Sequence, residues 1–307
     1  MRKFTLSFGL IFQLFLVVIV HSQENFGPLP DGVSIEHDLS FLAEGREEKL
    51  DLYQPTDRDK KTLSPAIVII HGGGWVKGDK NRKREFITGT TLAKSGYVCA
   101  SINYETRKEH RWPNNLHDCK NAVRWFRVHA EELQIDPERI GVIGGSAGGH
   151  LALMVAYTAD HPKLSPRQPY PGISDKVNAC VNMYGISNLL TRCLTDEDGM
   201  PTDELKTHRL FSESRTEAPE KWRLASPVTH ITKKSPPTLS LHGTKDHVVD
   251  RGQSNELHQE LKKVGVENKL IPIKGARHAW PLRTEKFDYT KEVTNFFNRH
   301  LKHTPAQ

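Results

Sequence analysis

The sequence predicts an α/β fold in which helices cover both faces of a mostly parallel sheet. Six short runs of apolar and β-branched residues recur along the chain, and polar or helix-periodic segments separate them. Each run is too short for a typical helix and is typical of a buried strand. Strands that alternate with helices favour a parallel sheet. The predicted strands cover residues 66–70, 97–102, 140–143, 179–184, 238–242 and 269–273.

Apolar residues at three- and four-residue spacing predict the helices between these strands. The clearest helix follows Pro113, where apolar side chains from Leu116 to Leu133 recur on one face, and Asp136-Pro137 ends it. Near the start, residues 33–38 and 49–53 are expected to add an antiparallel hairpin at the edge of the sheet. Further helices are expected over residues 147–157, 252–264 and 287–301.

Residues 185–237 differ from the rest of the chain. They are polar, contain Gly199, Pro201 and Pro219, and include no long apolar run. We therefore expect an excursion of short helices and loops above the sheet, which forms a small cap after the strand near residues 179–184.

The first residues have the layout of a secretory signal peptide. Arg2 and Lys3 are followed by an uncharged apolar run from Phe4 to Val20, and the next residues are polar. This layout predicts cleavage after residues 1–22, one domain over residues 23–307, and a secreted or periplasmic protein with no stable membrane insertion. An uncleaved membrane anchor is the alternative, although the run is short for a membrane span.

Composition excludes several other classes of protein. The net charge is +6, but the basic residues are scattered among acidic ones, which favours a solvated surface and argues against nucleic-acid binding. A weak attraction to acidic polysaccharide stays open. Cys99 and Cys180 lie in predicted strands, and the four cysteines show neither a CxxC motif nor metal-ligand spacing. We expect no catalytic thiol and no metal site, and leave disulfide pairing open.

Ser146 is the predicted nucleophile. The strand at residues 140–143 runs into Gly144-Gly145-Ser146-Ala147-Gly148, and a helix is expected to begin at once. A Gly-x-Ser-x-Gly motif between a strand and a helix forms a tight turn that exposes the serine oxygen. Glycine is needed there because side chains would collide in the strained backbone. The segment has neither the Gly-Lys-Ser/Thr of a phosphate loop nor the spacing of a dinucleotide site.

A run of three glycines predicts the oxyanion hole. His71-Gly72-Gly73-Gly74-Trp75 follows the strand at residues 66–70, so bare backbone amides can reach a ligand atom. We assign the amides of Gly73 and Gly74, together with that of Ala147, to a developing oxyanion. His71 is expected to fix the loop by hydrogen bonding. Trp75 is a candidate substrate-binding residue, although packing beneath the pocket is equally compatible with its position.

The acid and the base are expected after later strands, in the order Ser, Asp, His. Asp246 follows the strand at residues 238–242 and is preferred to Asp250, which lies nearer the next helix. His278 follows the strand at residues 269–273. Among sixteen histidines, His242 and His247 flank the acid too closely to reach both Asp246 and Ser146. His278 is therefore the predicted base, and Asp246 orients it.

Together these motifs resemble the His-Gly-Gly-Gly esterases of the α/β-hydrolase fold, which include hormone-sensitive-lipase-like carboxylesterases and bacterial feruloyl and acetylxylan esterases. The resemblance covers residues 45–300 and includes the segments at residues 118–125 and 136–140. Asn103-Tyr104 departs from the Asp-Tyr-Arg common in these enzymes, which puts the pocket rim in doubt. The resemblance implies hydrolysis of short-acyl esters without a metal or organic cofactor.

The expected substrate is therefore a small-molecule or polysaccharide-linked ester, with acetyl or feruloyl groups on carbohydrate as the leading hypothesis. An aryl formamidase or a peptidase would use the same triad. A non-catalytic binding protein on this fold is the alternative from another class, but such proteins commonly lack part of the triad or the glycine loop. The fold alone does not choose among these functions.

Overall fold

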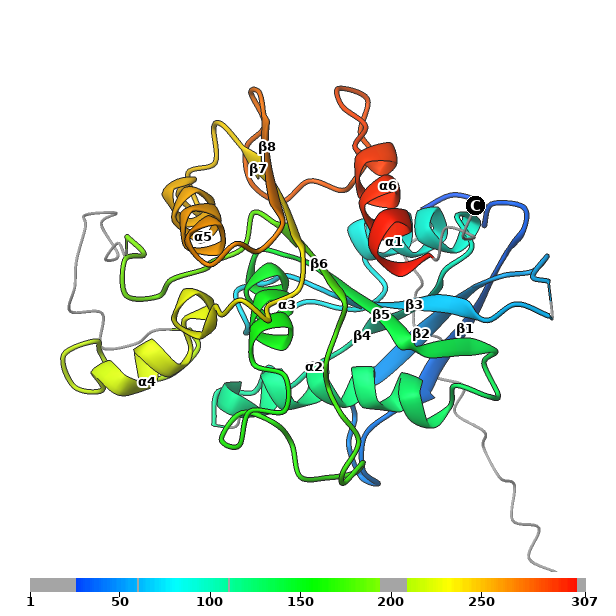
Figure 1. The fold of residues 1–307 in the computed structure, drawn as a ribbon, viewed down its shortest axis with the longest axis horizontal. Helices are drawn as coiled ribbons and strands as arrows, with labels where there is room; N and C mark the ends of the chain where they lie inside the picture. The colour runs from blue at the N-terminus through cyan, green and yellow to red at the C-terminus, as the bar shows by residue number, and fades with distance from the viewer. Residues whose placement is uncertain (1–25, 60, 110, 194–208, 303–307) are drawn as a thin grey trace, which may run out of the picture.

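The computed structural model confirms the predicted α/β architecture (Figure 1). One eight-stranded sheet has the order β1-β2-β4-β3-β5-β6-β7-β8. The pairs β1–β2 and β2–β4 are antiparallel, and every later pair is parallel. The structure describes residues 26–59, 61–109, 111–193 and 209–302. The strands are β1 (Val33–Ser40), β2 (Lys49–Pro55), β3 (Ser64–Ile70), β4 (Val98–Ile102), β5 (Ile135–Gly145), β6 (Ala179–Met183), β7 (Thr238–Gly243) and β8 (Asn268–Ile273).

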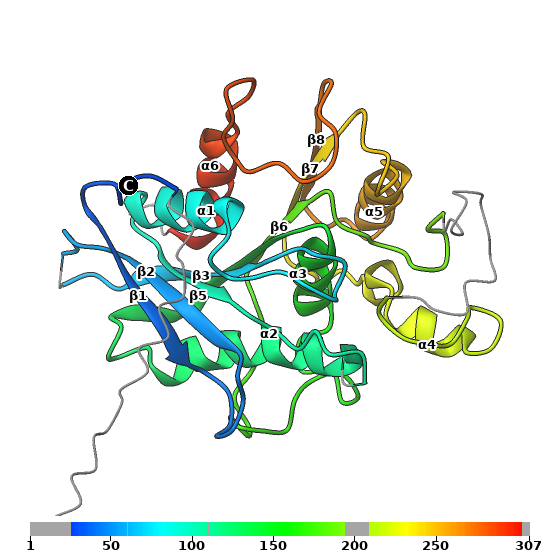
Figure 2. The same cartoon turned by 180° about the vertical axis from the view of Figure 1, so that it is seen from behind.

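Helices cover both faces of the sheet, as Figures 1 and 2 show. One face packs against α2 (Arg111–Val128), α3 (Ala147–Tyr157) and α5 (Gly252–Lys263), and the other packs against α1 (Lys83–Lys94) and α6 (Thr290–Leu301). Strand β3 illustrates the division, because Val68 contributes to the first core and its neighbours Ile67 and Ile69 contribute to the second. This alternation follows from the two-residue period of a strand.

Helix α1 was not predicted, and its sequence explains why. It contains Gly89 and three threonines, which have low helix propensity, and few apolar residues mark its buried face. Leu92 and Ala93 nevertheless pack fully into the core. A Cβ atom at Gly89 would lie 2.8 Å from the ring of Tyr53. The glycine therefore lets this helix approach β2 closely, and tertiary packing outweighs the weak local preference.

The predicted end of the helix after Pro113 was wrong. Helix α2 stops at Val128, and Asp136-Pro137 lies inside β5, which begins at Ile135. Ser64 pairs with Ile135, and the register shifts before Ala66 meets Ile140. Because of this irregularity, the turn-forming pair Asp136-Pro137 is accommodated within the strand.

The excursion after β6 contains short helical elements. Its described residues include α4 (Pro219–Leu224) and the 3₁₀ helix η1 (Pro227–His230), and none of them forms a strand. Trp222 is fully buried and belongs to the hydrophobic core that also includes α2, α3 and α5. Gly199, Pro201 and the predicted signal segment at residues 1–22 lie outside the described residues. No helix within the described ranges is both long and apolar enough to span a membrane.

Candidate active site

The turn that carries Ser146 joins β5 directly to α3. Ser146 adopts φ 57° and ψ −123°, a strained conformation for a residue other than glycine. A Cβ atom at Gly144 would lie 2.2 Å from the carbonyl oxygen of Gly148, and one at Gly148 would lie 2.2 Å from that of Ile70. Both glycines of the motif are thus required by close backbone contacts.

Three residues from distant parts of the chain meet at this turn. His278 Nε2 lies 2.9 Å from Ser146 Oγ, and His278 Nδ1 lies 2.7 Å from Asp246 Oδ2. A carboxylate can only accept, so His278 Nδ1–H donates to Asp246, and the unprotonated Nε2 accepts the serine hydroxyl proton. The structure therefore brings the three predicted residues together in the geometry of a hydrolase triad.

The surroundings of Asp246 keep its carboxylate ionised. Oδ1 accepts hydrogen bonds from the backbone N–H groups of Val248 and Val249 at 2.9 and 3.0 Å. Burial alone raises the pKa of Asp246, but hydrogen bonds from His242 and His278 outweigh it and hold the pKa well below its ordinary value. A permanently charged acid can orient His278 and stabilise its protonated form.

The competing residues lie elsewhere. Asp250 is exposed, and its carboxylate accepts the N–H of Gly252 at 2.6 Å. His247 is also exposed. His242 is buried beneath the acid, where its ring contacts Ser254 Oγ at 2.7 Å and lies 3.4 Å from Asp246 Oδ2. This second contact with Asp246 was not anticipated, because the sequence gives no sign of which way a buried histidine points.

The triple-glycine loop lies against Ser146. A Cβ atom at Gly72 would lie 3.3 Å from Ser146 Cβ, and Gly73 and Gly74 have φ values of +125° and +63°. Among the described residues, the N–H groups of Gly73, Gly74 and Ala147 have no hydrogen-bond acceptor. Three free amides beside the nucleophile can receive a negative oxygen, and Ala147 adds the N-terminus of α3.

His71 fixes this loop from below. Its Nδ1–H donates to the carbonyl of Gly72 at 2.8 Å, and its ring stacks on Tyr104 at 4.2 Å. Tyr104 in turn donates its hydroxyl to the carbonyl of His71 at 3.0 Å. Burial lowers the pKa of His71 to about 4, so the ring is neutral at physiological pH. His71 thus supports the loop through hydrogen bonding.

Of the two positions that the sequence allowed for Trp75, the structure has the one beneath the loop, and its substrate-binding role stays a prediction. Its side chain is 1% exposed and packs beneath the loop, edge-on to His150 at 5.3 Å. The indole N–H donates to His150 Nδ1 at 3.2 Å, and His150 Nε2–H donates to the carbonyl of Ala225 at 2.7 Å. From sequence alone, a tryptophan after a glycine loop can line the pocket or pack beneath the loop. Here the hydrogen bond to the buried His150 holds the indole beneath the loop.

Tyr184 and Arg84 lie beside the triad. Neither residue was selected from the sequence. Tyr184 follows β6, packs edge-on to His278 at 4.9 Å, and donates to the carbonyl of Trp280 at 2.7 Å. Arg84 Nη1 donates to the Tyr184 hydroxyl at 3.3 Å. Because Tyr184 follows the end of β6, its sequence position alone could have placed it at the same sheet edge as the triad. Arg84 lies in the helix that periodicity did not reveal.

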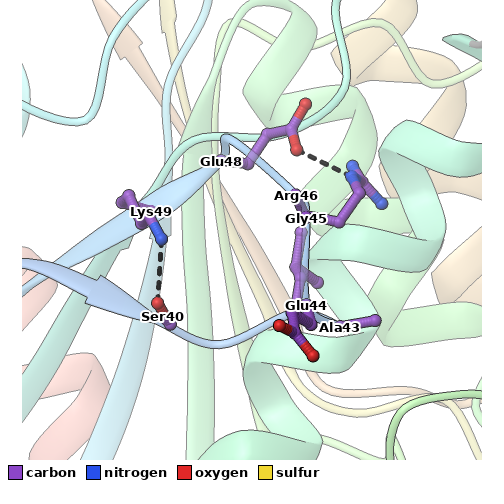
Figure 3. A pocket seen from close by; sticks show the side chains of 8 residues that line it. Ser40, Ala43, Glu44, Gly45, Arg46, Glu48 and Lys49 are labelled. Atoms are coloured by element: carbon purple, nitrogen blue, oxygen red, sulfur yellow. Dashed lines mark hydrogen bonds and ion pairs between the residues drawn. The ribbon is translucent and has the colours of Figure 1, made fainter.

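Other groups of reactive side chains lie away from the triad. Cys99, Cys119 and Cys180 are buried thiols, and Cys193 is exposed. In the described ranges, no group of three or more histidine, cysteine or carboxylate side chains could hold a metal ion. A cavity of about 200 Å³ lies in the turn between β1 and β2 (Figure 3), where Arg46 pairs with Glu48. It contains none of the triad residues.

Comparison with known proteins places this geometry in a family. The BD-FAE family model matches residues 50–261. The chain is 33% identical over 227 residues to the probable carboxylic ester hydrolase LipM of Mycobacterium tuberculosis, which covers 74% of this chain and 52% of LipM. It is 29% identical to esterase LipQ of the same organism, of which 57% is covered. The chain thus spans about half the length of these curated relatives.

Solved structures agree with the family match. A truncated carbohydrate esterase from gut microbiota superposes with a TM-score of 0.75 at 25% identity, covering 89% of this chain and 98% of that protein. Esterase 2 of Thermogutta terrifontis, phosphonylated by sarin, gives a TM-score of 0.73 at 26% identity over 92% of this chain and 99% of that one. The chain belongs to the BD-FAE family and has the α/β-hydrolase fold of these esterases.

Proposed function

We propose that this protein is a carboxylic ester hydrolase that forms an acyl-enzyme at Ser146. The hydrogen-bonded chain from Ser146 through His278 to Asp246 carries the proposal, because it gives the serine hydroxyl a base and gives that base an orienting carboxylate. The named esterases among the relatives support the same reaction class. Esterase 2 of Thermogutta terrifontis is phosphonylated by sarin, which is consistent with a reactive nucleophile in this fold.

The proposed reaction has two halves. Ser146 Oγ attacks the ester carbonyl while His278 Nε2 takes the hydroxyl proton, and the carbonyl oxygen becomes negative beside the amides of Gly73, Gly74 and Ala147. The C–O bond to the alcohol then breaks, and His278 returns the proton to the departing oxygen. Water repeats the sequence on the acyl-enzyme, which releases the acid and restores Ser146.

The proposed substrate class is a short-acyl ester on carbohydrate, with acetyl or feruloyl as the acyl group. One similar structure is a carbohydrate esterase, and another is a bifunctional GH43-CE protein of Bacteroides eggerthii. The excursion at residues 185–237 contains no long apolar segment in its sequence, so it offers little surface for a long acyl chain.

A matched pair of proteins tests the reaction class. Wild-type protein is expected to hydrolyse p-nitrophenyl acetate, and Ser146→Ala is expected to lose this activity while keeping its fold. An inert wild type, or an equally active variant, would refute the proposal. Acetate release from acetylated xylan, compared with ferulate release from methyl ferulate, then decides between the two acyl groups.

We also propose that residues 1–22 direct export, on the basis of the basic start and apolar run described above. Expression of the full chain with a C-terminal tag, followed by N-terminal sequencing of the exported protein, tests this. A mature N-terminus near residue 23 is expected. Retention of the intact chain in the membrane fraction would favour the anchor.

A further inference from the structure

Arg84 presents a fixed guanidinium group beside the nucleophile. Its Nε donates to Glu85 Oε1 at 2.8 Å, and its Nη2 contacts the same oxygen. Its Nη1 faces the site: a Cβ atom at Gly72 would lie 3.3 Å from this nitrogen and equally far from Ser146 Cβ. The side chain is 16% exposed, and Nη1 also donates to the Tyr184 hydroxyl at 3.3 Å, which fixes this nitrogen beside Ser146.

Arg209 lies against the oxyanion loop at Gly74. A Cβ atom at Gly74 would lie 2.9 Å from Arg209 Nη1 and 3.3 Å from its Cδ. The backbone of Arg209 is held in place because Arg111 Nη1 donates to its carbonyl. Arg209 is exposed, and no carboxylate in the described ranges pairs with its guanidinium. Within the part of the chain that the structure describes, the guanidinium of Arg209 is therefore an exposed positive charge beside Gly74.

The charge of Arg192 adds to this positive surface. Its guanidinium lies 5.6 Å from the ring centroid of Trp75, the residue that follows Gly74. Burial, followed by the positive charges of Arg209 and Arg215, lowers the pKa of Arg192 to about 10. Arg192, Arg209 and Arg215 are thus close enough for their charges to repel one another, which makes the potential near the loop positive.

We propose that Arg84 and Arg209 form an anion subsite, and that the preferred ester is carried by an acidic sugar. The inference rests on the proposed esterase function. Arg209 supplies the net charge, while Arg84, balanced by Glu85, supplies an oriented N–H group. Guanidinium groups match the paired oxygens of a carboxylate or a sulfate. Both groups flank Gly72–Gly74, so the anion binds on the same sugar as the ester whose carbonyl oxygen enters the loop.

Three acetylated methyl galactosides test the subsite, differing only at the terminal carbon of the sugar, which carries a hydroxyl, a carboxylate or a sulfate. Acetate release by the wild type is expected to favour the carboxylate ester over the neutral one by about tenfold in kcat/KM, mainly through KM. The sulfate ester distinguishes general anion binding from carboxylate binding. The preference is expected to shrink in 1 M salt because the Debye length falls to about 3 Å.

Arg209→Gln is the decisive variant, since the side chain is exposed and its loss leaves no buried partner. The ratio between carboxylate and neutral esters is expected to fall to near one, and Arg209→Glu is expected to invert it. Arg299→Gln is the matched control. Arg299 is 72% exposed and pairs with Glu267, which precedes β8 and so lies at the end of this strand away from the triad. This control is expected to keep the wild-type ratio.

A wild-type ratio near one, or a ratio that Arg209→Gln leaves unchanged, would overturn the anion subsite. Hydrolysis of p-nitrophenyl acetate with no acetate release from any of the three sugars would also overturn it, while the esterase function would stand. Failure with p-nitrophenyl acetate as well would reject the proposed function itself. The two failures are therefore distinguishable in one set of assays.

Discussion

Replacing Asp246 with asparagine should disable His278 by changing which of its nitrogens carries the proton. In the native site, Oδ1 accepts two backbone N–H groups, and Oδ2 accepts His278 Nδ1–H at 2.7 Å. Asparagine has one oxygen, and the two N–H donors at 2.9 and 3.0 Å hold it at the Oδ1 position. Its NH₂ group then faces His278 and donates to Nδ1. The remaining ring proton moves to Nε2, which can no longer accept the proton of Ser146.

The expected loss in kcat is about 10³- to 10⁴-fold, or about 4–5.5 kcal/mol of barrier, because both the tautomer and the stabilising charge are lost. Initial rates with p-nitrophenyl acetate measure it. Asp250→Asn is the control: that carboxylate is exposed, accepts the N–H of Gly252, and is expected to be dispensable. If Asp246→Asn keeps a tenth or more of the wild-type rate, or if Asp250→Asn loses as much, the assignment of the acid fails.

Three further predictions concern the scaffold around the site. Gly148→Ala would place a Cβ atom 2.2 Å from the backbone oxygen of Ile70, and a lower melting temperature in thermal unfolding is expected; an unchanged one would contradict the required close approach. Trp75→Phe leaves His150 Nδ1 without its donor, so denaturant unfolding should show a loss of about 1–3 kcal/mol with KM unchanged, whereas a raised KM would support a substrate role for Trp75. Burial lowers the pKa of His150 to about 4, against about 6.5 in an unfolded chain, so the neutral ring contributes stability above pH 6.5 that is lost as the pH falls toward 4. Denaturant unfolding across this window should show about 3 kcal/mol less acid destabilisation in His150→Gln than in the wild type, and parallel pH profiles would refute this.

The sequence predicted the triad because each residue follows a recognisable strand. Parallel strands end at the same edge of the sheet, so residues that follow β5, β7 and β8 can meet there. The glycines around Ser146 also have a local cause, since their neighbours leave no space for a Cβ atom. The strand positions and the order of the motif residues were therefore sufficient to choose Ser146, Asp246 and His278.

Features that depend on packing were not predictable in the same way. Helix α1 contains Gly89 and three threonines, which have low helix propensity, so the helix and the position of Arg84 beside Ser146 were not predicted. Trp75 suited a pocket wall and a buried position equally well, and only its hydrogen bond to His150 decides between them. Asp136-Pro137 is typical of a helix end, but the irregular register between β3 and β5 accommodates it within β5. In each case a contact with a distant part of the chain determines the outcome.

The nucleophilic role of Ser146 is tested most directly by covalent labelling. Esterase 2 of Thermogutta terrifontis is phosphorylated by paraoxon, so the same reagent is a suitable probe for this protein. Peptide mapping by mass spectrometry after paraoxon treatment should show a phosphoryl adduct on the peptide that contains Ser146, with none on Ser146→Ala. The account predicts that loss of p-nitrophenyl acetate hydrolysis parallels adduct formation. An adduct on another residue, or inactivation without an adduct at Ser146, would contradict it.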